Sequence, residues 1–355
     1  MCRFRSGILL KDRAVIAQKD NDSHQDMLEE LNISDTYENA ARVFVRAELI
    51  PEKEEWWTNP DGWEFVIDQD IVPDWFEEDR EGHISRFREA VKEWWSGHVM
   101  VGKKIDTLRT GYYMLKDCEV EKLCGDAVVL LNNSQVGKMY NSAQVGKMYN
   151  CAQVREMWGN SQVREMHGNS QVREMYGSTQ VREMYGSTQV GKMWDSSQVG
   201  EMYNSAQVGR MHGNSQVREM YGSAQVREMW GNSQVREMHN SAQVGEMHDS
   251  AQVREMRGNS QVGEMHDSAQ VGKMYGSTQV REMWGNSQVR EMRGNSQVGR
   301  MHGSAQVGKM YDGSAARDFK DYPRIKLLVP DVGSCRFELT AHKNEPTGGA
   351  GECKN

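Results

Sequence analysis

Residues 132–311 are built from one nine-residue unit that repeats without interruption. A valine stands at 136, 145, 154 and at every ninth position as far as Val307, which defines 20 units with no insertion or deletion. With the positions numbered one to nine, the consensus is [GND]-[SN]-[AST]-Q-V-[GR]-[EKR]-M-[YWHR]. Repetition at a fixed period constrains the fold more than chain length does, because each unit must pack against copies of itself.

The repeat does not suit a long amphipathic helix. Such a helix needs apolar residues at a spacing of 3.6, which one valine and one methionine per unit do not supply. The small residue at position three and the valine at position five flank a glutamine, which is the inward, outward, inward alternation of a short strand. Gly, Asn, Asp and Ser at positions one and two tolerate positive φ and predict turns. Short strands at fixed spacing predict a parallel β-solenoid.

Each repeated side chain has an expected place in such a solenoid. Valine and methionine are expected to stack into ladders inside the coil. The glutamine at position four is expected to form an outward amide ladder, which stabilises in-register parallel stacking. The alternative is that the glutamine caps a turn carbonyl inside the coil.

The residue at position nine distinguishes odd from even units. The four tryptophans at this position lie in units 3, 7, 11 and 17, and both arginines lie in units 14 and 18. Six of the eight tyrosines at this position lie in even units. Two units per coil would separate these residues into two columns, so we predict about 10 coils of 18 residues, spaced about 4.8 Å apart.

The segments on either side of the array predict caps for its open ends. In KDCEVEKLCGDAVVLL (116–131), Cys118 and Val120 match positions three and five, as do Ala127 and Val129. After the array, DGSAARDFKDY starts like a unit and then loses the valine and methionine, so the tail is expected to cap the last coil.

These features divide the chain into three predicted parts. A small α+β head covers 1–115, the solenoid with its degenerate cap units covers 116–311, and a C-terminal cap and tail covers 312–355. The predicted fold class is mainly β, a parallel β-solenoid with a small α+β N-terminal domain.

The head has the composition of an ordinary globular domain. Two stretches, DTYENAARVFVRAEL (35–49) and ISRFREAVKEWW (84–95), have the apolar spacing of helices. The head is also rich in tryptophan, which is expected to form most of a small core. These tryptophans are Trp56, Trp57, Trp63, Trp75, Trp94 and Trp95.

Charge, hydropathy and cysteine usage exclude several classes of protein. The net charge is −11 for 1–131, +3 for 132–311 and 0 for 312–355, so the array lacks the dense basic surface that binds a phosphate backbone. No stretch approaches the roughly 18 apolar residues of a membrane span, and Met1–Leu10 carries charges in place of a secretory signal, so we expect a cytoplasmic protein. The six cysteines have no CxxC spacing, which argues against a disulfide framework or a zinc site.

Calcium binding by the repeat is not expected, because nonapeptide calcium rolls need an aspartate-containing turn in every unit. Here only Asp195, Asp249 and Asp267 occupy position one. The few threonines lie at the inward position three, which also argues against an outward threonine face for ice binding.

An acidic segment of the head, 52–79, has 11 acidic residues against one lysine. Asp68, Asp70 and Asp74 could chelate a hard cation, but Pro73 stands where an EF-hand needs its turn glycine. A solvated acidic loop is therefore the favoured interpretation, and no metal or cofactor is expected.

Cys2 is a candidate catalytic residue. Removal of Met1 would expose its α-amino group beside its thiol, an arrangement that can serve as base and nucleophile together. Candidate partners are His24, Arg46, Glu48 and His83, although spacing does not show that they converge. The alternative is that MCRFRSGI simply begins a strand.

Four motifs of the head resemble an uncharacterised family from phages and gut bacteria. They are MCRFRSGI, the NDSH of 21–24, FVRAELIP (44–51) and IDQDIVPDWF (67–76). In that family a similar head precedes degenerate valine-containing repeats, so the resemblance extends over essentially the whole chain. It implies a phage or mobile-element setting and a solenoid, but no activity and no site residues.

The array favours a non-enzymatic interaction or scaffold protein that presents ladders of Tyr, Trp, His and Arg to a protein partner. Aromatic residues and arginine are enriched at binding hot spots, but position nine could equally lie at a corner where stacked rings only cover the coil edge. The alternatives are an enzyme head with the solenoid as targeting arm, and a single-stranded nucleic-acid binder whose rings stack on bases. A monomer or dimer is expected. The candidate binding residues are Trp158, Trp194, Trp230, Trp284, Tyr176, Tyr185, Tyr203, Tyr221, His212, His248, His266, Arg257 and Arg293.

Overall fold

The structure is a computed structural model, and its contacts divide the chain into two compact units. One extends to Gly137 and the other begins at Lys138. The residues that the structure describes are 5–17, 23–52, 57–311, 313–320, 323–328 and 336–338.

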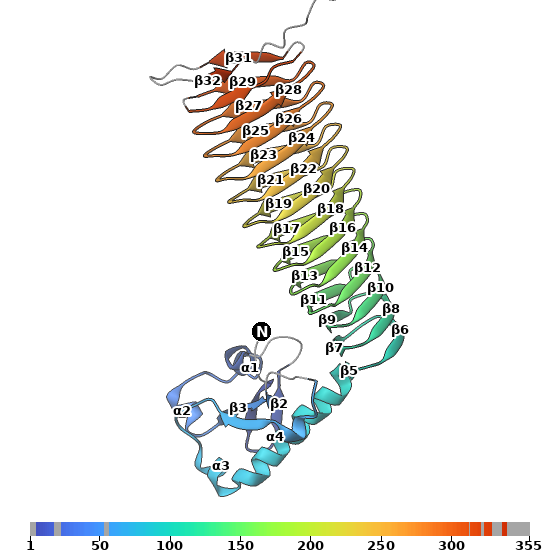
Figure 1. The fold of residues 1–355 in the computed structure, drawn as a ribbon. Helices are drawn as coiled ribbons and strands as arrows, with labels where there is room; N and C mark the ends of the chain where they lie inside the picture. Colours follow the sequence, from blue (N-terminus) through green and yellow to red (C-terminus); the bar gives the residue numbers. More distant parts are fainter. Residues whose placement is uncertain are drawn as a thin grey trace, which may run out of the picture. The chain divides into compact units, whose positions relative to one another are not determined.

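The repeats form a parallel β-solenoid with two sheets (Figure 1), as the sequence predicts. One sheet contains the odd-numbered strands β5 to β31 and the other the even-numbered strands β6 to β32, with 14 strands in each. The 20 units form β10 (Gln135–Met139) to β29 (Gln306–Met310). Each of these strands begins at the glutamine of position four and ends at the methionine of position eight, except that β11 (Gln144–Tyr149) is one residue longer.

The strand register confirms two units per coil. Gln180 of β15 pairs with Gln198 of β17, and Val181 pairs with Val199, so each residue lies beside the residue 18 positions later. Successive units therefore alternate between the sheets. We call the sheet that contains β10, β12 and so on to β28 the odd-unit sheet, and the other, from β11 to β29, the even-unit sheet.

The repeated apolar side chains fill the coil. The valines at position five are at most 1% exposed and the methionines at position eight are fully buried, which confirms both inward ladders. These two positions are three residues apart, so simple alternation would place them on opposite faces. The pairing of β15 with β17 omits position six, which is consistent with a change of strand direction there. This explains how both side chains point inward.

Position three is also buried, and it carries hydroxyl groups that lack a partner. The Oγ atoms of Ser197, Ser215 and Ser233 make no hydrogen bond, whereas Ser134 donates to Leu115 O at 3.0 Å. Other units have alanine here, also fully buried. An unpaired buried hydroxyl costs stability, because it has lost its hydrogen bonds to water.

Replacing Ser197, Ser215 and Ser233 together by alanine is expected to stabilise the array by about 1 kcal/mol per site. The measurement is the denaturant midpoint of the full chain. Ser134→Ala is the matched control and is expected to be destabilising, because it removes a satisfied donor. A triple variant that unfolds at lower denaturant would show that these hydroxyls are bonded.

The turn prediction is confirmed at position one. From unit 2 to unit 20 this residue has a positive φ, and it is always Gly, Asn or Asp, the residues that adopt this conformation at least cost. The aspartates also cap backbone N–H groups of the preceding coil: Gly177 N donates to Asp195 Oδ2, and Gly231 N to Asp249 Oδ2, both at 3.0 Å. These carboxylates are therefore occupied by hydrogen bonds within the turns.

The parallel coils begin earlier than the sequence suggests. They start with β5 (Val99–Val101), β6 (Lys104–Leu108), β7 (Tyr112–Lys116), β8 (Glu119–Leu123) and β9 (Val128–Asn132). Val99 pairs with Met114, only 15 residues later, so these first coils are shorter than 18 residues. Their sequences therefore do not show the nine-residue pattern. With them, the solenoid has about 12 turns.

The expected inward residues before the array are confirmed, since Cys118, Val120, Ala127 and Val129 are all buried. After the array, three further strands extend the two sheets. They are β30 (Ala315–Arg317), β31 (Arg324–Leu328) and β32 (Arg336–Glu338).

The head contains an antiparallel sheet of four strands in the order β2-β1-β3-β4. Met27 and Leu28 of α1 pack with Ile8 and Leu10 of β1, whereas α4 packs against a second cluster that includes Leu9. The two helices therefore cover opposite faces of this sheet. The elements are β1 (Arg5–Leu10), β2 (Ala14–Ile16), α1 (His24–Glu30), α2 (Tyr37–Ala40), β3 (Phe44–Ile50), η2 (Pro60–Gly62), β4 (Glu64–Ile67), α3 (Asp74–Glu78) and α4 (Arg80–His98).

One of the two predicted head helices is wrong. The helix expected over 84–95 lies within α4, but only α2 is helical in the stretch 35–49, and FVRAELI forms β3. This segment pairs with both β1 and β4, and such tertiary pairing overrides a local helix pattern. No helix in the described ranges is long and apolar enough to cross a membrane.

Candidate functional site

The residues at position nine form two columns, as predicted. We call the odd-unit residues from Tyr140 to His302 the Trp-rich column and the even-unit residues from Tyr149 to Tyr311 the Tyr-rich column. In the Trp-rich column the rings stack continuously from Trp158, with centroids 3.8 to 6.5 Å apart and planes within 17°. The stacked residues are Trp158, Tyr176, Trp194, His212, Trp230, His248, His266, Trp284 and His302.

The Tyr-rich column stacks in the same way and then changes character. Its rings from Tyr149 to His239 have centroids 4.8 to 5.3 Å apart, and this part includes Tyr185, Tyr203 and Tyr221. Beyond it, Arg257 lies over the ring of Tyr275 at 5.8 Å and Arg293 over that of Tyr311 at 4.4 Å. Arginine thus takes the place of a ring in the column.

In many of the units that have glutamate at position seven, its carboxylate lies at the polar edge of the ring. Trp158 Nε1 donates to Glu156 at 3.0 Å, His167 Nε2 lies 2.9 Å from Glu165, and the Tyr203 hydroxyl donates to Glu201. Positions seven and nine are two residues apart and can face the same side of the backbone, so this i, i+2 spacing was a readable signal. The sequence pattern had indicated only position nine as a candidate site, and the glutamate was not predicted.

The glutamate contacts change the acidity of both partners. The hydrogen bond to Glu174 raises the pKa of Tyr176 to about 12, and Tyr185 and Tyr221 are raised to about 12 by their own glutamates. In return, the Tyr176 hydroxyl holds the pKa of Glu174 below its usual value. Burial lowers the pKa of His212 in the Trp-rich column.

The faces of the rings are therefore largely covered by neighbouring rings of the same column. Most rings of the two columns are only partly exposed, and even Trp158 and Trp284 are only 37% and 38% exposed. The corner interpretation of position nine accounts for this stacking, whereas a binding role for the thirteen candidate residues stays a prediction.

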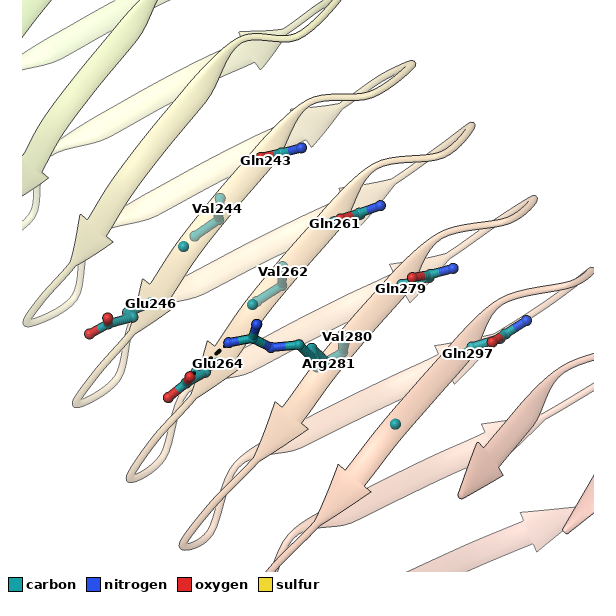
Figure 2. A pocket seen from close by; sticks show the side chains of 13 residues that line it. Gln243, Val244, Glu246, Gln261, Val262, Glu264, Gln279, Val280, Arg281 and Gln297 are labelled. Carbon is teal, nitrogen blue, oxygen red and sulfur yellow. Dashed lines mark hydrogen bonds and ion pairs between the residues drawn. The ribbon is translucent and has the colours of Figure 1, made fainter. Parts of the chain in front are cut away.

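The glutamines at position four point away from the coil. They are exposed in most units, which excludes the alternative in which they cap a carbonyl inside. Figure 2 shows Gln243, Gln261, Gln279 and Gln297 extending in the same direction from successive strands. The glutamines are aligned as a ladder along the array. Among the described residues, however, no hydrogen bond joins the side-chain amides of neighbouring glutamines.

A shallow groove of about 430 Å³ runs beside these four glutamines on the odd-unit sheet (Figure 2). Its floor is backbone, because position six is glycine at Gly245, Gly263 and Gly299. The carboxylates of Glu246 and Glu264 form the opposite wall. Arg281 reaches from the next strand to Glu264 at 2.9 Å and interrupts the groove.

In the head, Cys2 lies outside the described residues, but its candidate partners can be placed. Ser6 pairs with Glu48 and Ile8 with Arg46, so these side chains lie on the sheet face that α1 covers. His24 begins α1, and Asp68 Oδ2 lies 3.2 Å from its Nδ1. Burial lowers the pKa of His24, against the hydrogen bond to the Ala47 carbonyl, which raises it.

The fourth candidate partner lies elsewhere. His83 is buried on α4, stacked on Phe76 and edge-on to Trp75, in the cluster on the other face of the sheet. It therefore does not join His24 and Glu48. Catalysis by Cys2 stays a prediction.

No protein-family model, no curated protein and no solved structure matches this chain. The resemblance of the head motifs to a phage and gut-bacterial family stays a prediction.

Proposed function

We propose that this protein is a non-enzymatic interaction scaffold, whose solenoid holds a protein partner along the exposed glutamine column of one sheet and along the ring edges of the two columns. One observation carries the proposal. Glutamine is the same in all 20 units, yet it is exposed in most of them, whereas the other invariant residues, valine and methionine, are buried. The fold accounts for the buried residues, but in the described part of the chain these amide side chains show no hydrogen bond to one another.

A repeated amide is well suited to recognition. It offers two donors and an acceptor at one fixed spacing, so a partner could make many equal contacts on a rigid surface. The partly exposed Trp, Tyr and His rings of the two columns would add apolar contact. The near-neutral charge of the array suits a protein partner better than a phosphate backbone.

Nucleic-acid binding is the weaker candidate. Bases stack on free aromatic faces, but the rings here stack on one another at 3.8 to 6.5 Å. A cytoplasmic location and a phage or mobile-element setting belong to the same proposal. Buried free thiols at Cys118 and Cys124 are consistent with a reducing compartment, and the head motifs support the phage setting.

The test compares two matched quadruple variants of the full chain. One changes Gln207, Gln225, Gln243 and Gln261 of the odd-unit sheet to serine. The other changes four glutamines of the even-unit sheet to serine, namely Gln216, Gln234, Gln252 and Gln270.

We expect one set to weaken the partner's affinity at least about tenfold, since each lost hydrogen bond contributes about 0.5–1.5 kcal/mol. Both variants should melt close to the unchanged protein, because the changed side chains are exposed or, at Gln270, partly exposed. The partner is first identified by capture on the full chain, and its dissociation constant is then measured with each variant. Equal affinity for all three proteins would refute the role of the glutamines.

A further inference from the structure

A histidine and two carboxylates meet in the head, away from the repeats. His24 comes from the start of α1, Glu48 from β3 and Asp68 from the residue after β4. One ligand atom of each lies within 4.8 Å of the others. Three separate elements thus bring nitrogen and oxygen donors to one point, which is the arrangement that a bound cation requires.

The hydrogen bond of His24 orients the ring for such a role. Its Nε2 lies 3.3 Å from the carbonyl oxygen of Ala47. A carbonyl only accepts, so Nε2 carries the proton, and in the neutral ring Nδ1 then has the free lone pair. A backbone carbonyl that fixes the outer nitrogen is the usual support of a metal-binding histidine.

The inner nitrogen faces an acceptor. Nδ1 lies 3.2 Å from Asp68 Oδ2. Two lone pairs at this distance repel unless a positive charge lies between them, and a cation about 2.1 Å from each would satisfy both. The ion pair of the nearby Arg46 is with Asp35, and no ion pair between Arg46 and Asp68 is seen among the described residues.

A fourth polar side chain, that of Ser6, lies beside Glu48 on the same face of the sheet. Ser6 is fully buried, and its Oγ has no hydrogen-bond partner. It is directly opposite Glu48 in the register of β1 and β3, so the two side chains lie on the same face of the sheet. An unpaired hydroxyl beside a buried carboxylate is costly unless a further ligand or its water satisfies it.

We propose that His24, Glu48 and Asp68 bind one divalent transition-metal cation, Zn²⁺ or Mn²⁺, with Ser6 bonded to a water on that ion. One imidazole and two carboxylates suit these ions, whereas Mg²⁺ takes oxygen ligands and avoids imidazole. The two carboxylates balance the charge of the ion. The site is independent of the proposed scaffold function, since it uses no residue of the array.

The experiment measures metal binding to the full-length protein after treatment with a chelator. ZnCl₂, MnCl₂ and MgCl₂ are titrated separately by calorimetry, and bound metal is counted by elemental analysis. The informative variant is Asp68→Asn, whose side chain is 61% exposed and can be changed with little effect on folding. Asp70→Asn and Asp74→Asn are matched controls on the same acidic segment.

We expect one equivalent of Zn²⁺ or Mn²⁺ that Asp68→Asn weakens at least tenfold and that both controls retain, with little binding of Mg²⁺. His24→Gln should remove the same equivalent, and circular dichroism checks that this variant is folded. Zinc bound by histidines of the array would persist in every variant and is thereby told apart. Unchanged binding by Asp68→Asn, or no equivalent in the unchanged protein, would overturn the site and leave His24 and Asp68 as an ion pair.

Discussion

Replacing Met220 by aspartate is expected to disrupt the array at its middle, with a cost of about 4 kcal/mol or more. Met220 is fully buried at the end of β19 (Gln216–Met220), and it pairs with Met202 on one side and Met238 on the other. A carboxylate there would have methionine above and below it and no described cation to pair with. Either the coils must separate or the acid must stay protonated at neutral pH.

The damage should spread to the neighbouring coils. In a solenoid each coil is stabilised mainly by its two neighbours, so loss of one interior contact weakens both interfaces. Denaturant unfolding would show a lower midpoint, and limited proteolysis would show new cleavage near residue 220. Met220→Leu should cost less than about 1.5 kcal/mol, because it keeps the volume and the apolar character.

Arg218→Asp is the control for charge on the same strand. Arg218 has an exposed side chain that only approaches Glu219 at 3.3 Å, so reversing its charge should cost about 1 kcal/mol or less. If the aspartate at 220 were tolerated as well as the one at 218, the assignment of the methionines to the interior would be wrong.

The second large effect is expected from Tyr203→Ala in the Tyr-rich column. Its ring stacks between Tyr185 at 5.0 Å and Tyr221 at 5.2 Å, and its hydroxyl donates to Glu201. Loss of two stacking contacts and one charge-assisted hydrogen bond should destabilise the array by about 2–4 kcal/mol.

Two further variants separate the ring from its hydroxyl. Tyr203→Phe keeps the stack and loses only the hydrogen bond. Tyr203→His should cost less than about 1 kcal/mol, since His239 already stacks in this column and approaches Glu237 at 3.4 Å. All three are compared by denaturant unfolding, and an alanine variant as stable as the unchanged protein would show that the rings only cover the coil edge.

The raised pKa values of the tyrosines also predict that the array loses stability at high pH. Tyr185 and Tyr221 have a folded pKa of about 12, above the usual value of 10.0. Each therefore contributes stability that is complete below about pH 10 and is lost as the pH rises towards 12, where the phenol ionises beside its glutamate. When the unchanged protein and Tyr203→Ala are compared by denaturant unfolding, the unchanged protein should lose more stability over this pH range.

Most of the solenoid could be predicted because its determinants are local and repeated. The valine and methionine of each unit set the interior, and Gly, Asn or Asp at position one sets the turn. The separation of tryptophan from arginine between odd and even units was enough to predict the 18-residue coil. The head gave weaker signals: FVRAELI has a helix-like pattern, and only pairing with β1 and β4 makes it a strand.

The candidate sites were less predictable, because they depend on contacts between distant residues. Position nine was identified, but whether its rings are free or stacked depends on the coil above and below. The cluster of His24, Glu48 and Asp68 joins residues more than 40 positions apart, and sequence analysis had grouped Asp68 with Asp70 and Asp74 instead.

The amino-acid sequence by itself determined the repeating coil, since a period of nine with one inward valine and one inward methionine can bury its apolar surface only against copies of itself. Only the tertiary structure decided which outward side chains remain available to a binding partner. The coils place each ring within contact distance of the ring 18 residues later, and in many units the polar edge of the ring contacts a glutamate, so the columns become part of the fold. The glutamines project from the sheet beyond the reach of those contacts, and they remain the exposed, invariant residues of the repeat.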